Sequence, residues 1–172
     1  RIFSLSPSGS HLLYSRVISD TAGFSNTLWL IGTERNAEPT PLGISNVLWA
    51  DWNPSRTTAL QIGYTTADTT SQAPGWEANN DLWLLDIDPE NLEDAEPLRL
   101  MESYPALFGW WGGNYAWSPN GDTIAFGYAN EVGVVSTLLL EDEEEAARRT
   151  VQQFTQYDTL RDWVWVPSLT WA

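Results

Sequence analysis

A short turn sequence recurs along the 172-residue chain, and it constrains the fold more than any other feature. The copies read LSPSG at 5–9, WNPSR at 52–56 and WSPNG at 117–121, and SLTWA at 168–172 matches the lead-in to a fourth. Successive copies lie about 50 residues apart, a spacing that indicates one supersecondary unit repeated with insertions of variable length. The chain is therefore expected to be a repeat protein.

Each copy encodes a tight β-turn between two strands. Proline sets φ at the second position of a type I turn, and the adjacent Ser or Asn braces the turn through its side chain. Gly9 and Gly121 supply the left-handed conformation that follows in a tight hairpin. The second copy has Arg56 instead of glycine, so we expect a longer or bulged turn there. After the third turn, apolar residues alternate with small or polar ones over 122–128, which is the period of a half-buried strand.

Two further strands are expected in each unit. NTLWLIG at 26–32 and NDLWLLDID at 80–88 are near copies, and GVVSTLLLED at 133–142 is a weaker third. A short last segment follows in the first two units. In the third unit the matching residues, 143–154, pair Glu with Arg at helical spacing but also permit an edge strand. Each unit is thus expected to have four strands, in the order inner, second, third and outer.

Four-stranded units repeated at this spacing favour the blades of a β-propeller over a sandwich or a solenoid. We predict an all-β chain with about three antiparallel blades, which form a single partial propeller domain over 1–172. Propellers close with roughly four to eight blades, so we expect a fragment of a larger propeller, completed by blades of the same parent chain or of another chain. The predicted boundaries are about 1–43, 44–101 and 102–155 for the three blades and 156–172 for the start of a further blade.

The WSPNGDTIAFGY sequence at 117–128, together with NDLWLLDID at 80–88, resembles the repeat of the TolB-type, WD-like β-propeller family. The resemblance covers essentially the whole chain; the third unit is the closest copy and the second departs most. It implies a scaffold, a sensor, a partner-binding module or the gating domain of a peptidase, and the fold alone does not choose among these. We also expect an extracytoplasmic protein, either periplasmic or extracellular.

Composition narrows the partners and the chemistry. The net charge is −15 and the sequence pI is near 4.1, so the chain lacks the basic footprint that binding to nucleic acid or to an anionic membrane surface requires. No apolar run approaches the roughly 18 residues of a membrane span, so no direct membrane insertion is expected. There is no Cys and His11 is the single His, which excludes zinc-ligand spacing and Cys–His dyads within this chain.

The remaining polar clusters indicate no site of their own. The acidic residues of 86–96 lack the glycine of a calcium loop and are interrupted by Pro89, so a solvated loop is the favoured interpretation. The run at 141–149 is interpreted as a solvated, self-paired segment. The Gly-x-Ser-x-Gly elbow of a serine hydrolase does not occur. We therefore predict no catalytic residue, no metal and no cofactor.

Tryptophan is the most informative residue type, with 11 copies in the chain. Those in repeated strand positions, such as Trp52 and Trp117, are expected to pack between blades. Five others lie in loop segments that family geometry places on the face opposite the SPNG turns: Trp76, Trp110, Trp111, Trp163 and Trp165, within 65–80, 104–117 and 161–171. Packing within these loops is one explanation and ligand contact is the other, since Trp supplies a large stacking surface. The candidate binding residues are Trp76, Trp110, Trp111, Arg161, Asp162, Trp163 and Trp165.

The sequence thus predicts a non-catalytic binding or scaffold propeller that docks a protein, a peptide or a glycan on its Trp-rich loop face. Two alternatives stay open. One is an accessory or gating propeller of a larger enzyme, such as a serine peptidase, whose catalytic domain would be encoded elsewhere in the parent gene. The other is a structural segment of a multi-protein assembly.

Overall fold

The fold consists of β-strands and the turns between them. Its strands form three four-stranded antiparallel sheets and one short two-stranded ladder, with almost no helix in the part of the chain described below. The prediction of an all-β fold is therefore confirmed. A computed structural model describes residues 2–20, 23–66, 77–78, 81–92, 95–102, 106–107, 114–128, 131–138, 148–154 and 169–171.

The three sheets are built in the same way. In each sheet the strands stand side by side in their chain order, so every sheet is a simple antiparallel meander, and no sheet closes on itself. The last strand of the third sheet covers 148–153, which confirms the edge-strand alternative for that segment. The strands are β1 (Ile2–Leu5), β2 (His11–Asp20), β3 (Gly23–Gly32) and β4 (Thr40–Ser45) in sheet 1; β5 (Val47–Trp52), β6 (Leu60–Thr66), β8 (Leu82–Ile87) and β9 (Leu98–Met101) in sheet 2; and β11 (Asn114–Trp117), β12 (Thr123–Gly127), β13 (Glu131–Ser136) and β14 (Arg148–Gln153) in sheet 3.

The repeated turns join the first two strands of each sheet. In the first turn the Gly9 amide donates to the Ser6 carbonyl at 2.8 Å, and the third turn repeats this bond. Gly9 and Gly121 have φ values of 73° and 75°, a region in which a residue with a Cβ is strained. The second turn closes where the Asn53 amide donates to the Gln61 carbonyl at 2.8 Å, and it is longer than the other two. The expectation of a longer second turn is confirmed.

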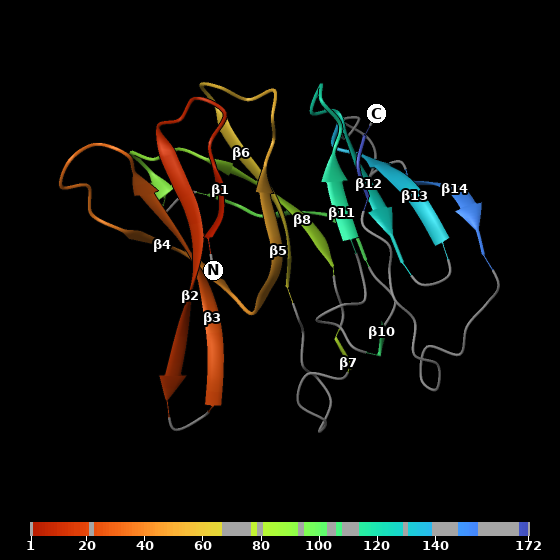
Figure 1. Ribbon diagram of the computed structural model, residues 1–172, viewed down its shortest axis with the longest axis horizontal. Coiled ribbons are helices and arrows are strands. Elements are labelled where there is room, and N and C mark those ends of the chain that lie inside the picture. Colours follow the sequence, from red (N-terminus) through yellow and green to blue (C-terminus); the bar gives the residue numbers. More distant parts are fainter. Residues whose placement is uncertain are drawn as a thin grey trace.

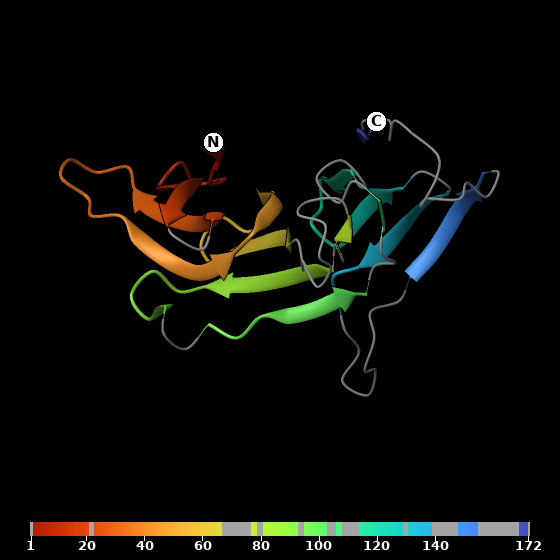
Figure 2. The ribbon, with the colours of Figure 1, turned by 90° about the horizontal axis from the view of Figure 1, so that it is seen from below.

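The turns and the long loops lie on opposite edges of the row of sheets (Figure 1). The three turns lie along the upper edge in that view, which we call the turn edge. The β2–β3 hairpin projects from the opposite edge, which we call the loop edge, and the two-stranded ladder of β7 (Glu77–Ala78) and β10 (Ala106–Leu107) lies there too. Seen from the loop edge, the sheets follow one another in chain order from sheet 1 to sheet 3 (Figure 2).

Neighbouring sheets pack face to face. We call the face of a sheet that is directed toward the preceding sheet its upstream face, and the other its downstream face. In β6, Ile62 and Tyr64 point upstream into the cluster shared with sheet 1. Gly63 points downstream, where a Cβ would lie 3.1 Å from side-chain atoms of Ile124 and Trp117. Because side chains alternate along a strand, β6 serves both interfaces, and the missing side chain at Gly63 lets sheets 2 and 3 approach closely.

Two buried apolar clusters hold the sheets together. Leu13 of sheet 1 packs in the first cluster with residues of sheet 2 such as Leu60. Leu84 of sheet 2 packs in the second cluster with Phe126 of sheet 3. Full burial of one such side chain stabilises the fold by about 1.5–3 kcal/mol relative to exposure. The interfaces between sheets, and not the single sheets, therefore supply most of the apolar stabilisation.

A tryptophan bond repeats from one sheet to the next. The Trp52 indole N–H donates to the Ser4 carbonyl at 3.1 Å, and the Trp117 indole N–H donates to the Asp51 carbonyl at 3.2 Å. The third instance joins Trp171 to the Ala116 carbonyl at 2.9 Å. Trp52 and Trp117 each stand immediately before the turn of their own sheet. The acceptor is in each case the residue just before the corresponding position of the preceding sheet: Ser4 before Leu5, Asp51 before Trp52 and Ala116 before Trp117. The units are therefore related by the same packing step each time, and residues 169–171 begin a fourth step.

Candidate functional site

Two of the three Trp-rich segments meet at the loop edge. β7 lies within the 65–80 loop and β10 within the 104–117 connection, and the two strands pair antiparallel with Ala78 opposite Ala106. The segments therefore run side by side at these residues. The predicted binding residues themselves lie outside the described part of the chain: Trp76, Trp110, Trp111, Arg161, Asp162, Trp163 and Trp165.

An aromatic cluster lies between sheets 2 and 3, toward the strand ends that are farther from the turns. The ring of Trp49 lies 5.2 Å from that of Tyr115. The rings of Tyr115 and Tyr128 stand at 84° to each other, and their hydroxyl oxygens are 3.1 Å apart. Phe126 packs beside Tyr128 at 5.3 Å between ring centroids. These tilted and edge-to-face geometries are favourable for aromatic rings. We call these four residues the tyrosine cluster.

Charged side chains border the tyrosine cluster on sheet 3. Glu131, at the start of β13, is buried and forms an ion pair with Arg148 of β14. The Thr150 hydroxyl also donates to Glu131, at 2.9 Å. The guanidinium carbon of Arg148 lies 4.9 Å from the centroid of the Phe126 ring. A buried carboxylate is tolerated only when it is paired and hydrogen-bonded, and both conditions are met here.

Burial keeps both hydroxyls of the tyrosine cluster protonated. It raises the pKa of Tyr115 well above 10.0, and the nearby Tyr128 adds to that rise. Burial also raises the pKa of Tyr128 to about 12, although the hydrogen bond from Tyr115 and the charge of Arg148 oppose the rise. A general base works best with a pKa near the working pH. The two tyrosines are therefore suited to hydrogen bonding and not to proton abstraction.

We expect the free energy of unfolding to fall as the pH rises from about 10 to about 12. Burial raises the folded-state pKa of both Tyr64 and Tyr128 from 10.0 to about 12, so the unfolded chain loses these protons first. The stabilisation is complete below the unfolded-state pKa and is lost as the pH passes the folded-state pKa. Each two-unit shift corresponds to about 2–3 kcal/mol. Urea unfolding at several pH values, followed by circular dichroism, measures the loss.

The matched variant for this pH dependence is Tyr64→Phe, which removes one of the two phenols. Its unfolding free energy should fall less steeply between about pH 10 and 12 than that of the unmodified chain. An unfolding free energy that stays flat over this interval in the unmodified chain would contradict the prediction.

Two buried side-chain oxygens make no hydrogen bond within the described residues, Asn26 Oδ1 and Thr65 Oγ1. Thr65 lies opposite Trp49 in the β5–β6 register, near the end of β6 where the 65–80 loop begins. A buried hydroxyl without a hydrogen-bond partner costs free energy. Thr65 lies on the strand that leads directly into the loop edge.

Two other polar residues singled out by the sequence, His11 and Asp86, have hydrogen-bond partners in the described part of the chain. His11 Nδ1 lies 2.9 Å from the Ser10 hydroxyl at the turn edge. Asp86 accepts a hydrogen bond from the Gln61 amide at 2.8 Å. Within the described ranges, no group of three His, Cys, Asp or Glu residues is placed to hold a metal ion. No helix in these same ranges is long and apolar enough to cross a bilayer.

Comparison with known proteins does not assign this chain to a family. No protein-family model matches the sequence, and neither the curated proteins nor the solved structures gave a match.

Sequence reasoning missed the tyrosine cluster and its charged border. A sequence signal for the tyrosine cluster was present. If the hairpin is extended from the third turn, Tyr115 pairs with Phe126, and Tyr128 follows two residues after Phe126 on the same face of the strand. No local pattern joins Glu131 to Arg148, which lie on different strands across a long connection.

Proposed function

We propose that the three sheets are blades of a partial β-propeller of the TolB-type, WD-like class, within one domain that spans the chain. Two features of the described residues support this. All three sheets have the same strand order. The indole-to-carbonyl bond recurs at equivalent positions, as for Trp52 with Ser4 and for Trp117 with Asp51. Unrelated sheets packed together would have no reason to repeat one hydrogen bond, whereas blades placed around an axis repeat every interface.

We further propose that the chain is a non-catalytic binding or scaffold module, with its partner docked at the loop edge. The observation that carries this is the β7–β10 ladder, which joins two Trp-rich segments on the edge opposite the turns. The tyrosine cluster lies buried beneath that edge, so the proposed contact surface is that of the Trp-rich segments. A protein, a peptide or a glycan fits such a surface, because aromatic residues dominate the energetics of binding sites. The net charge of −15 disfavours nucleic acid.

Protonated phenols and an ion-paired carboxylate favour binding over catalysis. Tyr115 and Tyr128 keep their protons at physiological pH, and Glu131 is held by Arg148 and Thr150. The phenols bond to each other between the sheets and supply no base near neutral pH. A cofactor is not required for this function.

A structural segment of a larger assembly is the second candidate. The half-exposed apolar faces at both ends of the row of sheets favour it, since such faces mark contacts between proteins. It differs from the first candidate in that its contacts lie on the ends of the row and not on the loop edge.

Alanine at Trp110 or Trp163 is expected to weaken partner binding by about tenfold or more, because a central Trp often supplies much of the energy of a contact. The probes are a panel of immobilised oligosaccharides and a displayed library of short peptides. Bio-layer interferometry on the ligands selected by the unmodified chain gives the dissociation constants. The thermal melting temperature, followed by circular dichroism, should stay within a few degrees of the original.

Trp29→Ala is the control for this experiment. Trp29 is half-buried on sheet 1, in the middle of β3 and away from the ladder, so its loss should leave the affinity unchanged. Full affinity in both Trp110→Ala and Trp163→Ala would overturn the placement of the binding site at the loop edge.

A further inference from the structure

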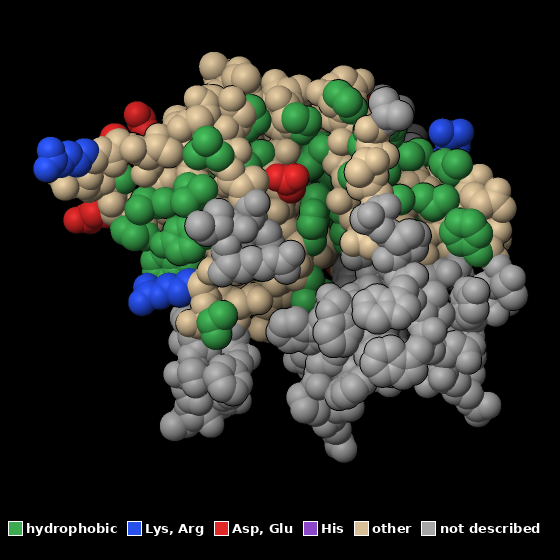
Figure 3. Space-filling model, in the orientation of Figure 1, with side chains coloured by type: hydrophobic (Ala, Val, Ile, Leu, Met, Phe, Trp, Pro, Cys, Tyr) green, Lys and Arg blue, Asp and Glu red, His purple; other side chains and the backbone are tan. Residues whose placement is uncertain are grey.

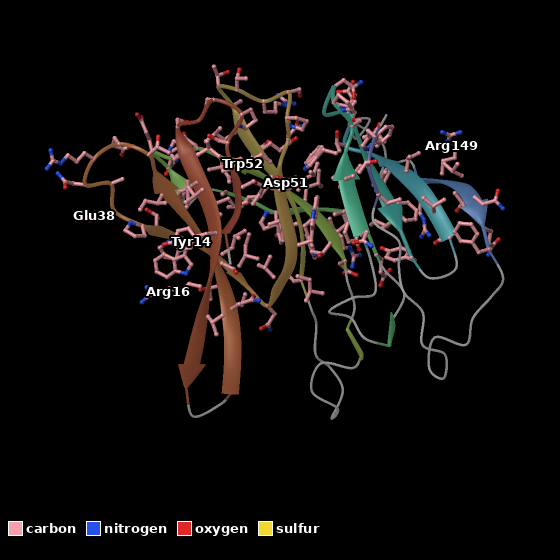
Figure 4. All side chains as sticks on the ribbon, in the orientation of Figure 1. Tyr14, Arg16, Glu38, Asp51, Trp52 and Arg149 are labelled. Atoms are coloured by element: carbon pink, nitrogen blue, oxygen red, sulfur yellow. The ribbon has the colours of Figure 1, made fainter. Side chains whose placement is uncertain are left out.

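The upstream face of sheet 1 is an apolar surface with the layout of a sheet-to-sheet interface. Leu12 lies opposite Ile31, and Tyr14 lies opposite Trp29, on the side of the sheet away from the first buried cluster. All four side chains are half-buried, and Leu5 of β1 is 54% exposed. Figure 4 shows Tyr14 and Arg16 directed away from sheet 2, and Figure 3 shows hydrophobic side chains gathered over the same strands.

The same positions are buried in sheet 2. The register pairs Trp52 with Ile62 and Tyr64 with Trp83, just as it pairs Leu5 with Leu12 and Tyr14 with Trp29 in sheet 1. In sheet 2 this set packs on sheet 1, and the exposed fractions of Trp52, Ile62 and Tyr64 are 4%, 0% and 4%. The upstream face of sheet 1 thus has the residues of an interface without the sheet that would cover it in the described part of the chain.

The downstream face of sheet 3 is the complementary surface. Ala125 and Val134 are paired on this face and are half-buried, whereas Ile124 and Val135, which point the other way, are fully buried. Residues 169–171 cover only part of it, where Leu169 approaches Gly127 and Trp171 reaches the Ala116 carbonyl. Among the described residues, both halves of the sheet-to-sheet interface are therefore present, one at each end of the row.

We propose that a second copy of this chain docks head-to-tail, with the downstream face of its sheet 3 on the upstream face of sheet 1. Two such contacts, related by a two-fold axis, would bring together the three described sheets of each copy, and six sheets fall in the range of roughly four to eight that close a propeller. The inference rests on the proposed propeller architecture but not on the proposed binding site. Its basis is continuity with the two interfaces already present in the molecule.

Charge and burial are compatible with this contact. The apolar residues of the upstream face carry no charge, and the guanidinium of Arg16 lies over the Trp29 ring at 5.3 Å. Trp171 and Leu5 are counterparts in the repeat, so only one of them can lie over the Ala116 carbonyl. Trp171 is 40% exposed, so an incoming Leu5 would displace a partly buried indole and its bond to the Ala116 carbonyl, and the apolar area of the new contact must outweigh that loss.

Sedimentation velocity over about 1 to 100 µM tests the proposal, a range that spans typical weak to moderate protein association. We expect the unmodified chain to form a dimer. Leu5→Glu should weaken association by roughly a hundredfold, because it places an unpaired carboxylate in an apolar contact. Since Leu5 is exposed in the monomer, this variant should fold normally. Val17→Glu is the control: Val17 is exposed on β2 but points to the opposite side of the sheet from Leu12 and Tyr14, and association should not change.

A mixing experiment separates this contact from a symmetric contact of sheet 1 with itself. Val134→Glu should also abolish the dimer, and an equimolar mixture with Leu5→Glu should restore it, because one intact interface remains between the two variants. If Val134→Glu fails to fold by circular dichroism, Val132→Glu on the same face replaces it. A monomer at every concentration, a Val134→Glu variant that dimerises normally, or a mixture without dimer would each overturn the proposal. Full ligand affinity in both Trp110→Ala and Trp163→Ala, measured on an intact dimer, would instead overturn only the loop-edge site.

Discussion

Replacing Trp117 with alanine is expected to lower the free energy of unfolding by about 3–5 kcal/mol. The Trp117 side chain is 8% exposed, packs in the cluster between sheets 2 and 3, and approaches Gly63 so closely that a Cβ there would lie 3.1 Å from its ring. Its removal leaves a cavity at the interface and takes the indole donor away from the Asp51 carbonyl. Urea unfolding followed by circular dichroism measures the change.

The repeat supplies a matched control for this substitution. Trp171 occupies the same position of the repeat and makes the same indole bond, to Ala116, but its side chain is 40% exposed. Trp171→Ala should therefore cost no more than about 1.5 kcal/mol. Trp117→Phe keeps most of the packing and should cost about 1 kcal/mol for the hydrogen bond. Equal losses in Trp117→Ala and Trp171→Ala would contradict the role of Trp117 as an interface residue.

Gly121→Ala is expected to destabilise the protein by about 3 kcal/mol or more. A methyl group there would collide with the side chains of Asn53 and Ser55, which belong to the turn of sheet 2. Asn53 is buried, and its side-chain amide donates to the Gly121 carbonyl at 3.0 Å. The side chain therefore cannot move aside without breaking a buried hydrogen bond. The positive φ of Gly121 adds about 1–2 kcal/mol of backbone strain.

Gly9→Ala separates the strain from the collision. Gly9 has a φ of 73°, close to the 75° of Gly121, but a Cβ there would meet no atom within 4 Å. The substitution should cost only the backbone term, about 1–2 kcal/mol. The difference between the two variants, obtained from urea unfolding curves, measures the contact between the turns of sheets 2 and 3. If the two glycines cost the same, that contact does not contribute to stability.

Both predictions concern the surfaces that set the spacing of the sheets, and this spacing bears on the proposed function. β7 leaves sheet 2 and β10 leads into sheet 3, so the ladder between them depends on how closely these sheets approach. A partner docked at the loop edge would contact segments from both sheets. Variants that loosen the interface at Trp117 should therefore weaken binding as well as stability.

Much of the fold could be read from local patterns. The turn sequences located the first hairpin of each sheet, because Pro and Gly restrict the backbone within four residues of one another. The arginine at position 56 correctly marked a longer turn. Alternation over 122–128 located β12, since the side chains of a strand alternate between its two faces. The segment 143–154 was ambiguous because its helical charge pairs and its strand-forming residues are both local signals, and pairing with β13 decides for the strand at 148–153.

The candidate site could be predicted less well. The sequence directed attention to Trp-rich loops, and all seven residues that it nominated lie outside the described part of the chain. The described residues instead show the tyrosine cluster and the Glu131–Arg148 pair beneath the same edge. These groups come from different strands, and a strand sequence does not state which partner its side chains will meet.

By itself, the sequence determined the all-β class, the four strands of each sheet and the places where the chain reverses at the recurring turn sequence, because these depend on backbone preferences of residues close together in the chain. Only the tertiary structure decided which face of each sheet meets its neighbour, as in the approach of Trp117 to Asp51 and of Asn53 to Gly121. The physical reason is that these contacts join residues far apart in the chain. They form only when the buried area gained between sheets outweighs the entropy of bringing them together, and no local pattern encodes that balance.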